Sequence, residues 1–173
     1  INQIPVIASG EVDESYGKVK WEIDRKGHLI VEGTGDLVEP GMGWMMPWDP
    51  YREQILSAEI YLTGMTDVSC FFCECYNLID VNWADFDTSN VTDMTGMFAS
   101  CSSLETINLS GFDTSNVEHM SGMFYECESL KELNLETFDT ENVQDMYEMF
   151  AGCSSLTTLD LSGFDMGNIL EAA

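Results

Sequence analysis

Most of this chain is one phrase repeated at a constant interval. The motif FDT(S/E)NV begins at Phe86, Phe112 and Phe138, a related FDMGNI begins at Phe164, and the interval is 26 residues each time. One period upstream, residues 60–85 align as a degenerate copy. A unit this short cannot close a hydrophobic core alone. We therefore expect successive units to stack and bury each other's apolar side chains.

The spacing of apolar residues changes within each unit. From Val91 to Cys101 they follow a helical period, and from Leu104 to Leu109 they follow L-x-x-L-x-L, which is typical of a short strand. Each unit is therefore predicted to be a short helix followed by a strand. The predicted fold class is α/β, a leucine-rich-repeat-like solenoid of 26-residue helix-strand units.

The segment before the repeats predicts a β-hairpin. Apolar residues alternate over 20–24 and again over 28–32, and Arg25, Lys26 and Gly27 between them favour a turn. We expect this hairpin to cap the first repeat, which would otherwise expose a strand edge. The predicted division is a β-rich cap at 1–58 and, at 59–173, one degenerate, three full and one partial repeat.

The repeat phrase resembles a known family. The stretch MFASCSSLETINLSGFDTSNV, which starts at Met97 and has near-copies at Met123 and Met149, resembles the BspA-like leucine-rich repeats of bacterial surface proteins. The hairpin sequence WEIDRKGHLIVEGTGDL, from Trp21 to Leu37, looks like the segment that often precedes such repeats. This resemblance implies an extracellular location on the bacterial cell surface.

The charge of the chain excludes two classes of partner. The formal net charge is -25, from 31 Asp and Glu against 6 Lys and Arg. From Glu53 onward there are 22 carboxylates and one basic residue, Lys131. Nucleic acid and anionic membrane need a basic surface and would be repelled. No apolar run approaches the roughly 20 residues that cross a bilayer, so we expect no membrane insertion by this segment.

The residue inventory argues against an enzyme. The two histidines, His28 and His119, are far apart in sequence, which disfavours a catalytic triad or a multi-histidine metal site. Acidic residues are abundant, but no carboxylate pair is singled out for glycoside hydrolysis. We predict no catalytic activity, no cofactor and no bound metal.

The cysteines are interpreted first as core residues. One cysteine recurs in each unit and is expected to be a buried free thiol, since cysteine behaves as a small hydrophobe. Cys70, Cys73 and Cys75 form a C-x-x-C-x-C cluster that also invites a zinc or redox interpretation. Zinc needs about four ligands, and acidic surroundings disfavour a reactive thiolate. The recurring positions are Cys75, Cys101, Cys127 and Cys153.

Two further rows of polar residues have two interpretations. A ladder of carboxylates could bind calcium. Alternatively each Asp could accept a hydrogen bond from its own turn, and each Asn could satisfy backbone groups of the neighbouring unit. We favour the structural role because each Asp stands among turn-forming residues. The rows are Asp87, Asp113, Asp139 and Asp165, and Asn90, Asn116, Asn142 and Asn168.

The outward positions of the predicted strands are the candidate ligand-binding site. Stacking places them in rows across one face, and such rows are the usual contact surface of repeat proteins. The alternative is that they are only solvated strand exteriors, because exposed strand positions are polar by patterning. The candidate residues are Asn82, Asn108, Asn134, Asp160, Thr106 and Glu132.

Two functions therefore remain for the chain. The first is an extracellular or cell-surface leucine-rich-repeat protein that acts in adhesion by binding a host or microbial surface protein or glycan. The second is a structural spacer or stalk with no ligand of its own. A protein partner of so acidic a face would present Lys or Arg.

Overall fold

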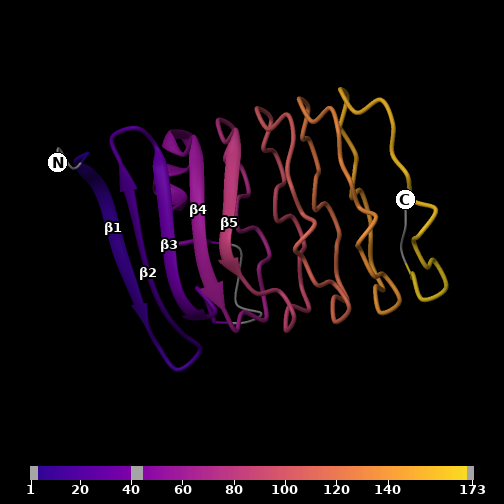
Figure 1. Cartoon of the computed structure of the whole chain (residues 1–173), viewed down its shortest axis with the longest axis horizontal. Helices are drawn as coiled ribbons and strands as arrows, with labels where there is room; N and C mark the ends of the chain where they lie inside the picture. Colours follow the sequence, from indigo (N-terminus) through magenta and orange to yellow (C-terminus); the bar gives the residue numbers. More distant parts are fainter. Residues whose placement is uncertain (1–3, 40–44, 171–173) are drawn as a thin grey trace.

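The computed structural model describes residues 4–39 and 45–170, and its strands form one sheet (Figure 1). Along the sheet the first two pairs of neighbouring strands are antiparallel and the last two pairs are parallel. In chain order, which is also their order in the sheet, the strands are β1 Val6–Asp13, β2 Gly17–Asp24, β3 His28–Gly35, β4 Ser57–Thr63 and β5 Asp80–Phe86.

The predicted hairpin is formed by β2 and β3. Trp21 is paired with Val31 in an antiparallel register, and both side chains are buried on the inner face of the sheet. The turn between the strands needs Gly27, which has φ 75°, and a Cβ there would lie 2.1 Å from the carbonyl oxygen of Gln54. The sheet continues from this hairpin through β4 and β5, so it runs without a break past residue 58.

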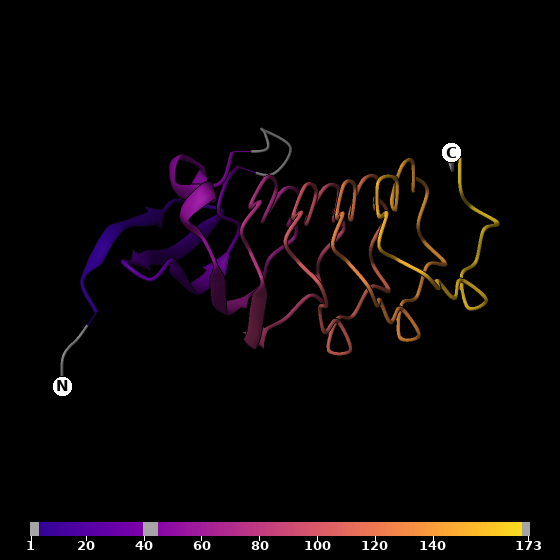
Figure 2. The same cartoon turned by 90° about the horizontal axis from the view of Figure 1, so that it is seen from above.

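From residue 60 onward the repeats stack as rungs, and β5 lies at the end of the first of them. We call each 26-residue unit a rung, namely 60–85, 86–111, 112–137 and 138–163. Seen from above, the rungs lie side by side along the molecule (Figure 2). Within 87–170 no extended strand forms, and neighbouring rungs are joined by isolated parallel bridges such as Thr106 with Glu132.

The predicted helix of each unit is absent. In the described part of the chain the one helix is the six-residue 3-10 helix η1, Asp49–Gln54, which precedes β4. Where the helix was expected, two successive turns form instead, closed by N–H···O bonds of 3.2 Å from Met97 to Met94 and 3.0 Å from Cys101 to Phe98. The prediction of an α/β leucine-rich-repeat-like solenoid of helix-strand units is therefore wrong, because the molecule is nearly all sheet and turn.

Left-handed residues explain why no helix forms. Gly96 and Ser100 have φ values of 61°, and each is the third residue of one of these turns. A positive φ at that position is required in a type II turn and ends an α-helix. The next rung repeats the arrangement at Gly122 and Glu126.

The backbone groups freed by these turns join the rungs in one direction. In each of the first three rungs the turn region donates four N–H groups to carbonyls of the following rung, at distances of 2.6–3.0 Å. An α-helix would use these same groups internally. The donors Met94, Gly96, Phe98 and Ser100 meet the carbonyls of His119, Ser121, Met123 and Tyr125.

The core runs continuously from the sheet through the rungs. One phenylalanine per rung stacks on the next, with ring centroids 5.9, 5.6 and 6.0 Å apart in the series Phe72, Phe98, Phe124 and Phe150. At the other end the fully buried Trp48 donates its indole N–H to the carbonyl of Phe71 at 3.2 Å. None of the helices in the described residues is long and apolar enough to cross a membrane.

Candidate functional site: the outer face of the rungs

The six predicted binding residues are all exposed on the outer face. They alternate with buried residues such as Leu109 and Leu135, as the L-x-L pattern requires. Thr106 and Glu132 are partners in a parallel bridge between neighbouring rungs. Asn82 lies on β5 opposite Glu59 of β4, and its amide donates to the Glu59 carboxylate at 3.2 Å. The residues thus form two rows, with Asn82, Asn108, Asn134 and Asp160 in one and Thr106 and Glu132 in the other.

Three of these side chains also hold their own turns. The side-chain oxygens of Asn108 and Asn134 accept the N–H of the residue two positions later, at 3.1 and 2.9 Å. Asp160 accepts the N–H of Ser162 in the same way at 2.9 Å, and hydrogen bonds from Ser162 hold the pKa of this carboxyl below its usual range. The sequence reasoning did not anticipate this turn role.

Two grooves lie between rungs on this face. The first has a volume of about 280 Å³ and contains Asn82 and Asn108; the second, of about 580 Å³, contains Asn134 and Asp160. Each therefore has two of the predicted residues on its wall. The other lining residues are Val81, Trp83, Phe86, Ser110, Gly111 and Phe112 in the first groove, and Leu133, Leu135, Glu136, Thr158, Leu159, Ser162, Gly163 and Phe164 in the second.

The first groove has an aromatic floor that sequence reasoning missed. The ring of Trp83 stacks on Phe86 at 4.9 Å and meets Phe112 edge-on at 5.0 Å. The buried Nε1 of Trp83 has no hydrogen-bond partner among the described residues. The next two rungs have Leu109 and Leu135 at the place of Trp83. This departure from the repeat was the feature of the sequence that could have indicated an aromatic groove.

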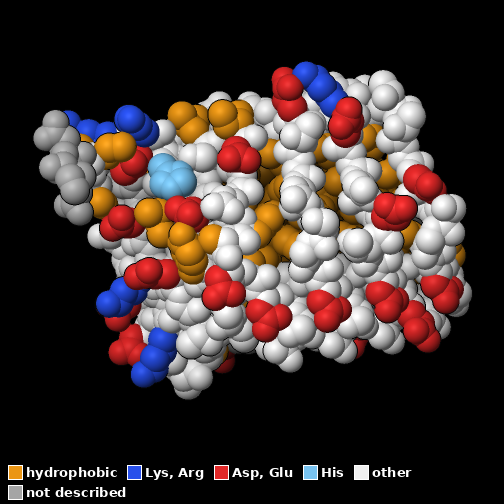
Figure 3. All heavy atoms as spheres, in the orientation of Figure 1, with side chains coloured by type: hydrophobic (Ala, Val, Ile, Leu, Met, Phe, Trp, Pro, Cys, Tyr) orange, Lys and Arg blue, Asp and Glu red, His pale blue; other side chains and the backbone are white. Residues whose placement is uncertain are grey.

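The charge on this side of the molecule is negative. Figure 3 shows apolar side chains in the middle of the rung face and carboxylates along its edge. Lys131, the single basic residue after Arg52, is paired across rungs with the carboxylate of Glu105 at 2.6 Å. Because that cation is already paired, it does little to offset the surrounding carboxylates.

The repeated Asp row and three of the four Asn residues, all but Asn90, have the structural role that we favoured. Asp113 accepts the N–H of Ser115 at 3.0 Å and its hydroxyl at 2.6 Å, and these bonds lower the pKa of the carboxyl. Asp87, Asp139 and Asp165 bind their own turns in the same way. The amides of Asn116, Asn142 and Asn168 donate to a carbonyl of the preceding rung at 2.6–2.8 Å.

The cysteine row also occupies equivalent places in the rungs. Cys75, Cys101 and Cys127 are buried, as predicted, whereas Cys153 is half-buried. The thiols of Cys101, Cys127 and Cys153 each donate to a phenylalanine carbonyl of the preceding rung at 3.1–3.2 Å. Burial raises the pKa of Cys127 to about 12, so this thiol stays protonated and unreactive.

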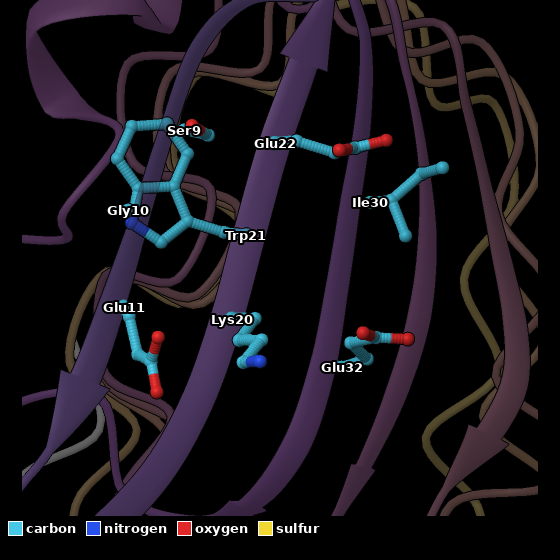
Figure 4. A pocket seen from close by; sticks show the side chains of 8 residues that line it. All are labelled: Ser9, Gly10, Glu11, Lys20, Trp21, Glu22, Ile30 and Glu32. Carbon is cyan, nitrogen blue, oxygen red and sulfur yellow. The ribbon is translucent and has the colours of Figure 1, made fainter.

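A separate concavity of about 550 Å³ lies on β1, β2 and β3 (Figure 4). Lys20 stands between Glu11 and Glu32 on this surface, and the indole of Trp21 lies against Gly10. A Cβ at Gly10 would fall 2.5 Å from the indole nitrogen, so glycine is required there. This concavity does not recur along the rungs, and we do not assign the binding site to it.

No group of three or more His, Cys, Asp or Glu side chains within 4–39 and 45–170 is arranged to hold a metal ion. Among known families, the model described as "Mycoplasma protein of unknown function, DUF285" matches residues 63–173. No curated protein and no solved structure matches the chain. The resemblance to BspA-like leucine-rich repeats is therefore wrong, because the family that matches is a distinct one.

Proposed function

The chain belongs to the DUF285 family of Mycoplasma proteins of unknown function, and from this premise we propose that it is a binding module displayed outside a bacterial cell. The outer face of the rungs holds a surface protein or glycan of a host or another microbe, and the module thereby acts in adhesion. The proposal assigns recognition to this face and no catalysis.

The observation that carries the proposal is the pair of grooves between rungs. Each combines an apolar floor with amide or carboxylate groups at its edge, which is the usual composition of a ligand site. Their walls belong to rungs that are fixed by repeated hydrogen bonds, so little ordering is needed on binding.

Charge favours a basic protein among the candidate partners. An acidic face attracts Lys and Arg over several ångströms, which accelerates association at low salt. At physiological salt the Debye length is about 8 Å, so the association rate should fall as salt is added while the dissociation rate changes less. A neutral glycan held by the Asn amides would show little salt dependence.

The experiment is a binding screen of the purified chain against host proteins and glycans, followed by variants of any pair that binds. T106K/E132K replaces one neutral and one acidic side chain of the outer face with lysine and leaves the side chains that hold turns unchanged. This variant should weaken the binding of a basic protein at least tenfold. E118K is the control, because Glu118 lies beside the separate row of bridges through His119. Equal loss in both variants would contradict the proposed face.

A second variant tests the contribution of the groove to binding without changing the charge of the face. W83L introduces the residue that later rungs carry at this place and removes the aromatic floor of the first groove. A partner that uses this groove should lose affinity at unchanged salt dependence. If W83L and T106K/E132K both bind as the wild type does, the outer face is not the site.

One observation favours the spacer function instead. The side-chain oxygens of Asn108, Asn134 and Asp160 are already engaged in their own turns, as they would be in an array that serves only to extend. Absence of any specific partner in the screen, with the chain folded, would support that alternative.

A further inference from the structure

The first rung differs from the others at one turn. Cys70 and Cys73 occupy the places of Gly96 and Ala99 in the next rung. Cys70 has φ 55°, a left-handed conformation that suits glycine and strains other residues. Glu148 has the same left-handed conformation at the equivalent place of the last rung, so what sets the first rung apart is the pair of cysteines in this turn.

The two thiols lie within reach of each other. The N–H of Cys73 donates to the carbonyl of Cys70 at 3.0 Å, which closes a β-turn. The Cα atoms at the ends of such a turn lie within about 7 Å, and disulfides form at Cα separations of roughly 4.4–6.8 Å. The side chain of each cysteine is the largest influence on the pKa of the other, which is consistent with two thiols that lie close together.

Residues that precede the first rung surround this turn. Arg52 of η1 pairs with the carboxylates of Glu74 and Asp49, and its positive charge also acts on Cys73. Trp48 fixes the middle of the turn through its bond to the Phe71 carbonyl. Cys73 is half-buried and Cys70 is 8% exposed, so the first is the more accessible thiol.

We propose that Cys70 and Cys73 form a thiol–disulfide exchange site, which reacts with small disulfide-containing molecules and closes to an intrachain disulfide. Cys73 is the attacking thiol and Cys70 is the resolving thiol. This site is independent of the binding face proposed above, because it lies on the turn side of the first rung.

The reaction proceeds in two balanced steps. The Cys73 thiolate attacks one sulfur of the small disulfide, forms a mixed disulfide and releases one thiolate, which takes a proton from water. Cys70 then loses its proton to solvent and attacks the Cys73 sulfur, which releases the second thiolate. Two protein thiols are oxidised, and one small disulfide is reduced to two thiols.

The electrostatics of the pair support this order. The hydrogen bond from Cys70 lowers the pKa of Cys73, with a smaller contribution from Arg52, while burial, Glu74 and Asp49 oppose it. The same hydrogen bond, burial, and the charges of Asp49 and Asp93 raise the pKa of Cys70. Of the two thiols, the accessible one therefore ionises more readily, as an attacking thiol requires.

The test uses dithiodipyridine, an uncharged aromatic disulfide that releases a coloured thione, on the reduced chain. The repeat itself provides the variants, because C70G and C73A install the residues of the next rung and should preserve the turn. Folding of each is checked by circular dichroism and thermal melting. Buried Cys101 and Cys127 are the internal reference for slow thiols.

We expect the wild type to release two equivalents of thione rapidly and to lose two hydrogen atoms in mass, with peptide mapping placing the disulfide at Cys70–Cys73. C70G should release one equivalent at a similar rate and retain the mixed disulfide on Cys73. C73A should lose the rapid phase, at least tenfold. A wild type that keeps a stable mixed disulfide at Cys73, or that modifies Cys73 no faster than Cys101, would overturn the proposal.

Discussion

The sheet and the rungs hold their backbones in different ways. In the sheet, strands of seven or eight residues pair through backbone bonds along most of their length. Between rungs, bridges are isolated, the backbone bonds come mainly from the turns, and buried threonines add further bonds. Thr88 donates its hydroxyl to the carbonyl of Asp113 at 2.9 Å and accepts the N–H of the same residue at 2.8 Å.

This difference shows that a repeat can replace continuous strand pairing with turn N–H groups and side chains at fixed positions. Thr114 and Thr140 repeat the bonds of Thr88, and all three threonines are buried. A sheet tolerates many residues on its strands because the backbone carries the pairing. The rungs should therefore be more sensitive than the sheet to single polar substitutions.

The largest expected effect is on the stack of phenylalanines. F124A removes a fully buried ring between two neighbours and should lower the free energy of unfolding by about 3–5 kcal/mol. The adjacent Y125A, at a half-buried position, should cost less than about 1 kcal/mol. Urea denaturation measures both; a loss in F124A no larger than in Y125A would show that the stack does not hold the rungs together.

The threonine ladder should give the next largest effect. T114V keeps the shape of the side chain but leaves the partly buried N–H and carbonyl of Asp139 without their hydroxyl partner, which should cost about 1–3 kcal/mol. T63V on β4 is the matched change in the sheet and should stay within about 0.5 kcal/mol. Equal costs at the two sites would remove the distinction between the regions.

The left-handed turns predict a pair of opposite effects. G122A places a Cβ at φ 59° and should destabilise by about 1 kcal/mol, although the nearest contact, with Tyr125 Cβ, is an acceptable 3.6 Å. E148G relieves the same strain at the equivalent position of the next rung, where φ is 53°, and should stabilise by a similar amount. Thermal melting of both variants measures these changes in stability. If G122A and E148G shift the melting temperature in the same direction, the explanation by left-handed turns is wrong.

The smallest expected effect is a pH dependence of the Asp turns. Because the pKa of Asp113 is lower in the folded chain, its contribution is present above the unfolded value of about 3.9 and is lost as pH falls through the folded value. The carboxyl is exposed, so the contribution should be under about 0.5 kcal/mol. Unfolding of D113N and wild type between pH 5 and pH 2 should converge at the acid end; a gap that widens with acid would reverse the sign.

Sequence patterning predicted the hairpin and the stacking period but mistook turns for a helix. The residues from Met94 to Cys101 have helical spacing because two type II-like turns in succession also return every third or fourth side chain to the core. Gly96 was evidence against a helix in the sequence itself, since glycine inside a helix costs about 1 kcal/mol. Ser100 and Glu126 gave no such evidence, because serine and glutamate have no preference for the positive φ that they adopt here.

The candidate sites also have some features that the sequence predicted and others that it did not. The outward rows followed from alternation alone, so their exposure could be predicted, whereas the groove floor depends on Trp83 meeting Phe112 of another rung. The setting of Cys73 could not be foreseen either. Arg52 is brought to it only by the packing of η1 against the first rung.

The repetition of the same bonds at each boundary between rungs has a genetic consequence. Every internal boundary joins the same donors to the same carbonyls, so removing or duplicating one 26-residue unit in frame recreates a boundary that already exists. Near-identical coding repeats are themselves prone to unequal recombination. An array of this kind can change its length between lineages without evolving a new interface, and the spacing of its grooves stays constant as it does so.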